Sequence, residues 1–155
     1  MANNNVYIAP ENSLNDSENF KIFLAGTIDN GSSDDWQQNL INYINNNYTD
    51  IDIYNPRRSF CDIEQGSKEF KEQVDWELDH LNKCDLILMN ILRDSKSPIS
   101  LLEMGLFANS RKMLVVCEPG FYRYDNVKIV CERYHIPLYN HISELLFDIE
   151  HLLLK

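Results

Sequence analysis

The feature of this sequence that most constrains its fold is a regular alternation of short apolar runs with longer amphipathic segments. The apolar runs suit buried strands, and the segments between them carry apolar residues at helical spacing. Strands are predicted at 21–26, 50–56, 85–91, 112–118 and 136–139, and helices at 34–48, 68–84, 98–109, 126–134 and 143–155. Because such alternation builds a mainly parallel sheet covered by helices, the sequence predicts an α/β sandwich with about five strands.

Length and charge narrow the class of protein. With 155 residues, 44% of them hydrophobic, the chain suits one domain, expected over 20–155 after a loose polar arm at 1–19. The formal net charge of −10 argues against general binding to a nucleic-acid backbone but leaves room for a small charged substrate. No apolar run reaches the length of a membrane span and no secretory signal is visible, so we expect a cytoplasmic protein without membrane contact.

The cysteines and histidines indicate no metal site. Cys61, Cys84, Cys117 and Cys131 form no Cys-x-x-Cys pair and no zinc-binding spacing, and the four histidines are scattered. Cys84 and Cys117 fall in apolar strand contexts, so we expect them to be buried free thiols.

A glutamate stands inside the apolar segment SPISLLEMGLFA at 97–108. Ser97 is a favourable N-cap and Pro98 suits the first helical position, so a helix is predicted to begin here. Helical spacing places Glu103 on one face with three apolar residues, Ile99, Leu106 and Phe107. A carboxylate on such a face is a candidate nucleophile or general acid/base. A glutamate that snorkels to solvent, or one held by an arginine for structure alone, is the alternative.

Two loops expected at the carboxyl edge of the sheet carry candidate binding groups, because ligands of parallel sheets bind at that edge. Gly26 and Thr27 lead through DNGSS into a helix, which suits a phosphate or a ribose hydroxyl. No Walker A motif follows, and a plain strand–helix connection explains the segment equally. In the NPRR segment, Arg57 and Arg58 would clamp an anion or stack on a base, or else pair with surface carboxylates.

A second carboxylate is available on the helix predicted at 68–84. Glu77 lies beside the apolar stripe of Phe70, Val74, Leu78 and Leu81, whereas Asp75 and Asp79 form an i,i+4 pair of like charges. Most charges on such a helix are solvated. One that reached Glu103 would give the pair of carboxylates used in glycosidic chemistry, where one attacks the anomeric carbon and the other manages the proton.

Five segments together resemble the nucleoside 2-deoxyribosyltransferase-like family over about residues 21–138. They are IFLAGTID…DDW, YNPRR, QVDWELDHLNKCDLILMNI, SPISLLEMGLFA and VVCEPGFYRYDNVKIVCERYHIP. The resemblance implies a flavodoxin-like (Rossmann-like) fold and chemistry at an N-glycosidic bond without a cofactor or metal. It also implies a nucleoside or nucleotide as the small-molecule partner and a homodimer or higher homo-oligomer.

The resemblance implies a role for individual residues. Glu103 matches the nucleophile of a Glu-x-Gly motif, and Glu77 falls where an Asp usually helps the base leave, with Asp79 as a weaker substitute. Asn126 is the candidate that a neighbouring subunit would contribute, or a plain turn residue. The expected substrate-binding residues are Gly26, Thr27, Ile28, Asp29, Asp34, Trp36, Asn55, Arg57, Arg58, Ser97 and Asn126.

Two departures from the family pattern bear on the reaction. Ser97 stands where transferases carry an Asp, and a Ser there resembles the 2′-deoxynucleoside 5′-monophosphate N-hydrolases, in which it contacts the phosphate. Glu77 replaces the usual Asp with a longer side chain. A hydrolase is therefore the favoured reading. The alternatives are a deoxyribosyltransferase, a TIR-like NAD glycohydrolase and a non-catalytic nucleotide-binding module. The NAD glycohydrolase is disfavoured, because the segment before Glu103 lacks the Trp-Cys usually found before the glutamate of that class.

Overall fold

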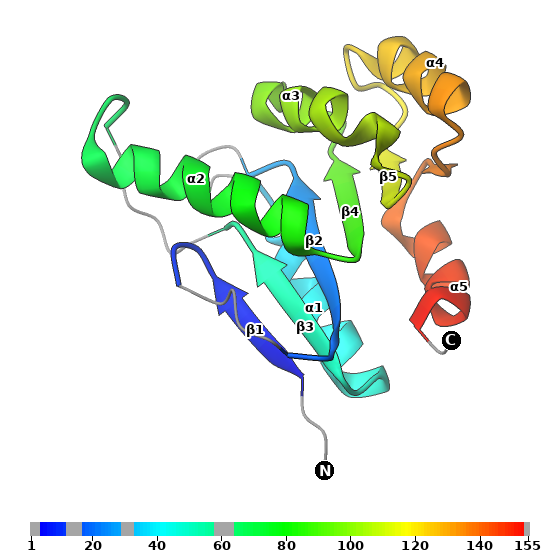
Figure 1. Ribbon diagram of the computed structural model, residues 1–155. Helices are drawn as coiled ribbons and strands as arrows, with labels where there is room; N and C mark the ends of the chain where they lie inside the picture. Colours follow the sequence, from blue (N-terminus) through cyan, green and yellow to red (C-terminus); the bar gives the residue numbers. More distant parts are fainter. Residues whose placement is uncertain (1–3, 12–16, 29–32, 58–63, 154–155) are drawn as a thin grey trace. The chain divides into compact units, whose positions relative to one another are not determined.

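The computed structural model describes residues 4–11, 17–28, 33–57 and 64–153. Its residue contacts divide the chain into two compact units. Unit 1 comprises Met1–Leu24 and Asn30–Asp85, and unit 2 comprises Ala25–Asp29 and Leu86–Lys155. Strand β2 (Phe20–Gly26) begins in unit 1 and ends in unit 2, and Figure 1 follows the chain through both.

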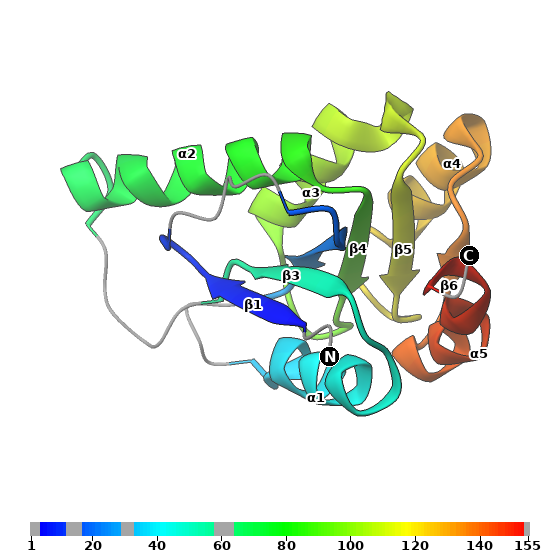
Figure 2. The ribbon, with the colours of Figure 1, turned by 60° about the horizontal axis from the view of Figure 1, so that its bottom comes forward.

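Unit 1 contains three parallel strands and two helices. In it, β3 pairs with β1 on one side and with β2 on the other, with Asp52 opposite both Asn5 and Lys21. Figure 2 shows the two helices on opposite sides of these strands. Besides β2, the elements of this unit are β1 (Asn5–Ile8), α1 (Trp36–Asn47), β3 (Ile51–Asn55) and α2 (Lys68–Lys83).

Both helices of unit 1 begin at side chains that cap them. The Asp35 carboxylate accepts a hydrogen bond from the Gln38 amide at the start of α1, and the Ser67 hydroxyl accepts one from the Phe70 amide at the start of α2. Each cap satisfies an amide that has no partner inside its helix. These polar residues therefore fix where the chain leaves the loops.

The buried face of α2 differs from the predicted stripe. Trp76, His80 and Leu81 are buried, whereas Val74 is 37% exposed. The Trp76 and His80 rings stack with centroids 4.0 Å apart, and the Tyr54 ring meets His80 edge-on at 4.6 Å. Large rings bury more apolar area than Val74 or Leu78, so α2 turns its aromatic residues toward the core.

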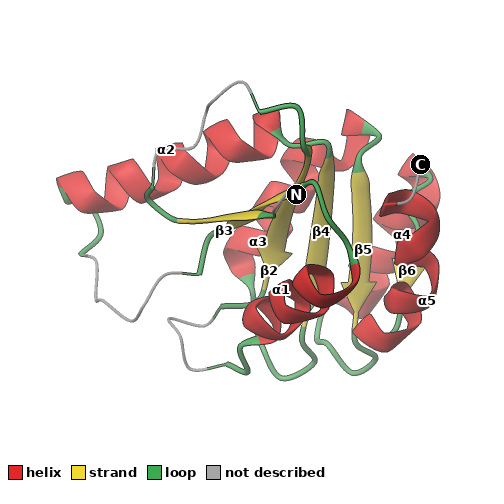
Figure 3. Ribbon diagram, turned by 90° about the horizontal axis from the view of Figure 1, so that it is seen from below, coloured by secondary structure: helices red, strands yellow, loops and turns green. Residues whose placement is uncertain are grey.

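Unit 2 repeats the alternation of strands and helices, as Figure 3 shows by colour. In it, β5 pairs in parallel with β4 and with β6. Its elements are β4 (Leu86–Ile91), α3 (Pro98–Phe107), the 3-10 helix η2 (Ala108–Ser110), β5 (Met113–Cys117), α4 (Tyr124–Tyr134), β6 (Leu138–Tyr139) and α5 (Ile142–Leu153). Strand β4 and strand β5 are buried along their whole length, in agreement with their continuous apolar sequence.

The predicted α/β class with a parallel sheet is confirmed and is consistent with a flavodoxin-like fold. The described residues contain six strands rather than about five, because β1 lies inside the segment expected to be a loose arm. Its Asn-Val-Tyr-Ile sequence supplies β-forming residues that pair with β3. The prediction of a loose arm was therefore wrong for Asn5–Ile8. Cys84 and Cys117 are buried free thiols, as predicted.

No helix within residues 4–11, 17–28, 33–57 and 64–153 combines the length and the apolar character that crossing a lipid bilayer requires.

Candidate functional site

Glu103 lies on the buried side of α3, and its residue surface is only 7% exposed. Its buried neighbours on the helix are Ser100 and Met104. The sequence had placed it on one face with Ile99 and Leu106, but these residues are 57% and 59% exposed. The prediction of a shared buried face was therefore wrong for Ile99 and Leu106, whereas Phe107 is half-buried. Because α3 is apolar almost all round, apolar spacing alone does not select which side faces the core.

Three buried hydroxyls meet where α3 begins. Thr27 Oγ1 lies 2.7 Å from Ser97 Oγ and 3.1 Å from Ser95 Oγ, and the two serine oxygens are 2.8 Å apart. Thr27 is only 1% exposed, and Ser95 and Ser97 are each 6% exposed. We call Thr27, Ser95 and Ser97 the hydroxyl triad. It joins the end of β2 to the loop that precedes α3, all within unit 2.

Ser97 occupies the N-cap position of α3 in an unexpected conformation. Its φ of 45° and ψ of 51° are left-handed, and in the part of the chain that the structure describes its side chain makes no capping hydrogen bond to the helix. The prediction that Ser97 is the N-cap residue is therefore confirmed, but the predicted hydrogen bond from its side chain to the helix is not formed. The hydroxyl turns to Thr27 and Ser95 instead, because the left-handed backbone directs it away from the helix amides.

Gly26 brings the end of β2 into close contact with β4. Its φ is 127°, and a Cβ at this position would lie 2.1 Å from the carbonyl oxygen of Asn90. The next residue, Thr27, donates its amide to the same carbonyl at 3.0 Å. Only glycine fits both the backbone conformation and the space. This close approach is what places the Thr27 hydroxyl in the triad.

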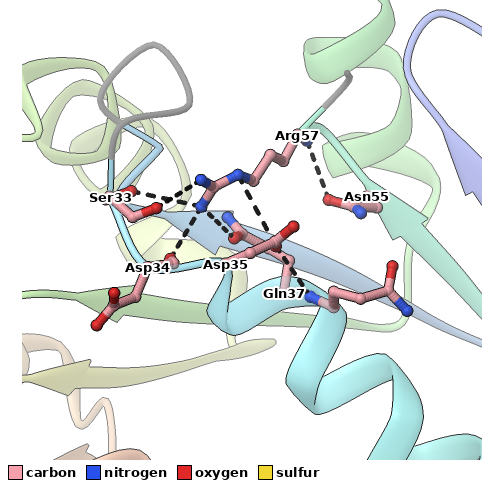
Figure 4. Close-up of polar contacts among 7 residues, drawn as sticks. Ser33, Asp34, Asp35, Gln37, Asn55 and Arg57 are labelled. Carbon is pink, nitrogen blue, oxygen red and sulfur yellow. Dashed lines mark hydrogen bonds and ion pairs between the residues drawn. The ribbon is translucent and has the colours of Figure 1, made fainter. Parts of the chain in front are cut away.

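Arg57, in unit 1, holds the segment that enters α1 (Figure 4). Its guanidinium donates to the carbonyl oxygens of Ser33 at 2.6 Å and Asp34 at 2.9 Å, and lies 3.8 Å from the Asp35 carboxylate. It also donates to the Gln37 side chain at 3.4 Å, while its side chain is only 9% exposed. We call this group the Arg57 cluster. The sequence had offered an anion clamp, a base-stacking group or a surface ion pair, and the shortest contacts of the guanidinium are with the two backbone carbonyls.

Glu77 lies half-buried on α2. Burial raises the pKa of its carboxyl group to about 7, and a hydrogen bond from Gln73 opposes this shift. The Gln73 amide also donates to the Pro56 carbonyl oxygen at 3.2 Å, just before Arg57. A carboxyl group with a pKa near neutrality can both give and take a proton under physiological conditions.

The remaining predicted binding residues are distributed over both units. Asn55 is buried, and its side-chain oxygen accepts the Arg57 amide at 3.0 Å. Trp36 is buried at the start of α1, and its amide donates to the Asp34 carbonyl oxygen. Ile28 is half-buried, whereas Asp34 and Asn126 are exposed. Asp29 and Arg58 lie outside the described residues.

Ser95 and Asp35 are among the residues of these clusters that were not predicted as site residues from the sequence. Ser95 belongs to the hydroxyl triad, and its only signal was the Ser-Lys-Ser spacing, which places two serines on one side of an extended segment. Asp35 caps α1 and faces Arg57, and its signal was its place before an amphipathic helix. Among the described residues, no group of three or more His, Cys, Asp or Glu side chains is arranged to hold a metal ion.

Comparison with known protein families gives a match that covers both the Arg57 cluster and the hydroxyl triad. The family model described as nucleoside 2-deoxyribosyltransferase like matches residues 19–121. The chain belongs to this family. The match includes Gly26, Thr27, Arg57, Glu77 and Glu103. No curated protein matches the chain.

Membership of the nucleoside 2-deoxyribosyltransferase-like family supports nucleoside glycosyl transfer or cleavage as the general chemistry. It also implies small-molecule nucleosides as substrates. Residues 122–153, which contain Asn126, α4 and α5, lie beyond the matched region.

Proposed function

We propose that the protein cleaves the N-glycosidic bond of a nucleoside, deoxynucleoside or nucleoside 5′-monophosphate, with Glu103 as nucleophile and water as the final acceptor. The observation that carries this proposal is the burial of Glu103 on α3, inside the matched region. A carboxylate kept on the buried side of an apolar helix is costly to desolvate, and such groups concentrate at functional sites.

In the proposed reaction, a Glu103 carboxylate oxygen bonds to C1′ of the sugar as the bond between C1′ and the base nitrogen breaks. The base leaves with a proton supplied by Glu77, whose pKa of about 7 keeps a protonated fraction available near neutrality. Water then attacks C1′ of the glycosyl ester, gives up a proton to the Glu77 carboxylate and restores Glu103. This two-step route is the one used by retaining glycosidases.

Transfer to a second base is the alternative outcome of the same ester intermediate. Ser97 favours hydrolysis, because its position holds an Asp in the transferases that the sequence resembles. A non-catalytic nucleotide-binding module is the other alternative. It requires none of the proton transfers assigned to Glu77.

We also propose that the protein forms a homodimer through the outer face of α3, with Asn126 as the residue that one subunit contributes to the other. Ile99, Leu102 and Leu106 are 57–59% exposed and share this face at helical spacing. The one charged residue of α3, Glu103, is buried, so two such faces meet without opposing like charges despite the net charge of −10. Leu102→Glu should convert the dimer to monomer in sedimentation experiments, and Glu132→Gln on the exposed side of α4 should not.

The function is tested by release of free base from a panel of nucleosides, deoxynucleosides, their 5′-monophosphates and NAD. The panel is run with and without added free base, and products are separated by chromatography. Glu103→Gln keeps the size of the side chain but removes the nucleophile, and Glu132→Gln is the matched control on an exposed surface.

Base release by the unaltered protein and by Glu132→Gln, but not by Glu103→Gln, is the expected result. Stimulation by free base, with exchange of the base, would identify a transferase instead. Equal release by Glu103→Gln would refute the assigned nucleophile. Saturable nucleotide binding without release from any compound would favour the binding module.

A further inference from the structure

Gln73 lies half-buried on α2, one turn before Glu77. The i,i+4 spacing places both side chains on the same side of the helix, and Gln73 donates a hydrogen bond to the Glu77 carboxyl group. The Gln73 side-chain nitrogen also donates to the carbonyl oxygen of Pro56 at 3.2 Å. A primary amide nitrogen carries two protons, so this one nitrogen can serve both acceptors at once. All three residues belong to unit 1.

Pro56 gives this bridge an end that other contacts already hold. It is buried and directly follows β3. The residues on either side of it are joined, because the buried side-chain oxygen of Asn55 accepts the Arg57 amide at 3.0 Å (Figure 4). The Arg57 guanidinium in turn holds the loop before α1. Gln73 therefore connects the Glu77 carboxyl group to the supported end of a buried strand.

Glu77 needs such a connection to act as a general acid. Its side chain has several rotatable bonds and is only half-buried, so ordering it has a cost in conformational entropy. A general acid works only within hydrogen-bond reach of the atom that receives its proton. The hydrogen bond from Gln73 selects those conformations in which the carboxyl group lies beside the end of β3.

Burial and the bond from Gln73 are, among the described residues, the causes of the shift in the Glu77 pKa. Asp75 and Asp79 are exposed and lie two positions away on α2, so they project from other sides of the helix. His80 is buried, and desolvation lowers its pKa, so it is neutral near neutral pH. The Gln73 amide donates to the ionised carboxylate, so its loss should raise the Glu77 pKa further.

We propose that Gln73 is a positioning residue, which holds the Glu77 carboxyl group beside the end of β3 by bridging it to the Pro56 carbonyl oxygen. The inference rests on the proposed function, since it concerns the proton donor of the same reaction. A pair that serves only to stabilise α2 is the alternative. The two differ in their effect on turnover, which a helix-stabilising pair leaves unchanged in the folded protein.

The titration of Glu77 in the substrate-free, full-length protein tests the bridge itself. It is followed by NMR of the side-chain carboxyl carbon, assigned with Glu77→Gln, in the unaltered protein and in Gln73→Met. Methionine keeps the length of glutamine and suits a helix but cannot donate a hydrogen bond. Gln38→Met is the matched control, because Gln38 makes an i,i+4 bond to Asn42 at 2.9 Å on the exposed side of α1.

We expect the midpoint of the Glu77 titration to rise by about one pH unit in Gln73→Met, the size of a hydrogen bond to a partly exposed charged group. Gln38→Met should leave the midpoint unchanged. Gln73→Asn, which is too short to reach both acceptors, should act in the same direction if Gln73→Met does not fold.

Base release then tests the effect on the reaction. Because Glu77 must be protonated to act as the acid, the alkaline limb of the pH profile should move to higher pH with the titration. At the pH optimum, kcat should fall about tenfold in Gln73→Met with less than about a threefold change in KM, because the acid is misplaced. Adding Gln73→Met to Glu77→Gln should lower kcat no further, since Gln73 acts through the Glu77 carboxyl group.

An unchanged Glu77 titration in both Gln73→Met and Gln73→Asn would overturn the inference. So would an unchanged kcat in these variants, or an equal loss with and without the Glu77 carboxyl group, which would indicate a purely structural role. Base release by the unaltered protein alongside such a result refutes the role of Gln73 alone. A raised titration midpoint without base release from any compound refutes the proposed reaction and supports the bridge.

Discussion

The Arg57 cluster and the hydroxyl triad both fix a loop to the end of a strand, but they use different chemistry. Arg57 is a donor only, and its guanidinium meets carbonyl oxygens of Ser33 and Asp34 that can only accept. In the triad, the hydroxyls of Thr27, Ser95 and Ser97 can each both donate and accept.

The difference determines how many arrangements each region has. A guanidinium held by carbonyl oxygens can only donate to them, and its removal leaves the half-buried Ser33 carbonyl oxygen and the more exposed Asp34 carbonyl oxygen without this donor. A ring of hydroxyls can reverse its donors by rotation about single bonds. We infer that the Arg57 cluster is a fixed support, whereas the triad can change its hydrogen bonds when a ligand binds.

The largest expected effect comes from the backbone contact beneath the triad. Gly26→Ala should lower the free energy of unfolding by about 4 kcal/mol or more, because its Cβ would lie 2.1 Å from the Asn90 carbonyl oxygen at a φ of 127°. Urea unfolding measures this loss. An unchanged free energy of unfolding in Gly26→Ala would mean that the close contact between Gly26 and Asn90 does not hold the triad in place. The contrast drawn here between the triad and the Arg57 cluster would then fail.

Gly66→Ala is the matched control for this substitution. Gly66 also has a positive φ, of 84°, but its Cβ would meet nothing within 4 Å. It should cost about 1 kcal/mol from backbone strain alone. The difference between the two variants measures the contact with Asn90, and equal losses would contradict its importance.

The next largest effect is expected at Arg57. Arg57→Ala should lower the free energy of unfolding by about 2–4 kcal/mol, because it leaves the Ser33 and Asp34 carbonyl oxygens without their donor. Arg57→Lys should recover only part of this loss, since an ammonium group lacks the planar fork. Arg133→Ala, at an exposed position on α4, is the control in the same urea titration. Full recovery by lysine would show that charge matters here and geometry does not.

The two regions also differ in how far the sequence predicted them. The alternation of apolar runs correctly gave the helices and every described strand except β1, because all the residues of a strand such as Leu86–Ile91 are buried and apolar or nearly so. The sequence also identified Thr27, Arg57 and Ser97 as residues of the loops. It did not predict the hydrogen-bond partners of these residues, because those partners are the groups that lie close in the folded structure, and the sequence does not show which groups these are. Ser95 and the face of Ile99 were missed for the same reason, since a short polar loop and an apolar helix carry no directional pattern.

The two units also differ in their response to pH, because Glu77 in unit 1 titrates near neutrality and the hydroxyls of the triad in unit 2 do not. The pKa of Glu77 is about 7 in the folded protein, above its ordinary value of 4.5, because burial disfavours the charged form. Its contribution to stability is therefore complete below pH 4.5 and is lost as the pH rises through 7. Glu77→Gln should be more stable than the unaltered protein by roughly 2 kcal/mol at pH 8, after allowance for partial exposure, and equally stable at pH 4.5. Urea titrations at both pH values measure the difference, and a gain that does not change with pH would contradict the assignment.

The smallest effect is expected from the triad itself. Thr27→Val keeps the shape of the side chain but removes the hydroxyl, so the Leu92 amide loses its acceptor. The loss should be about 1 kcal/mol, because hydroxyls that lose one partner can rotate toward another and Leu92 is only half-buried. Thr27→Ser keeps the hydroxyl and should retain the amide contact, so it should recover most of this loss. A loss in Thr27→Val as large as that of Arg57→Ala would mean that the hydroxyls are as fixed as the guanidinium. In that case the triad could not change its hydrogen bonds for a ligand, and the contrast between the two regions would fail.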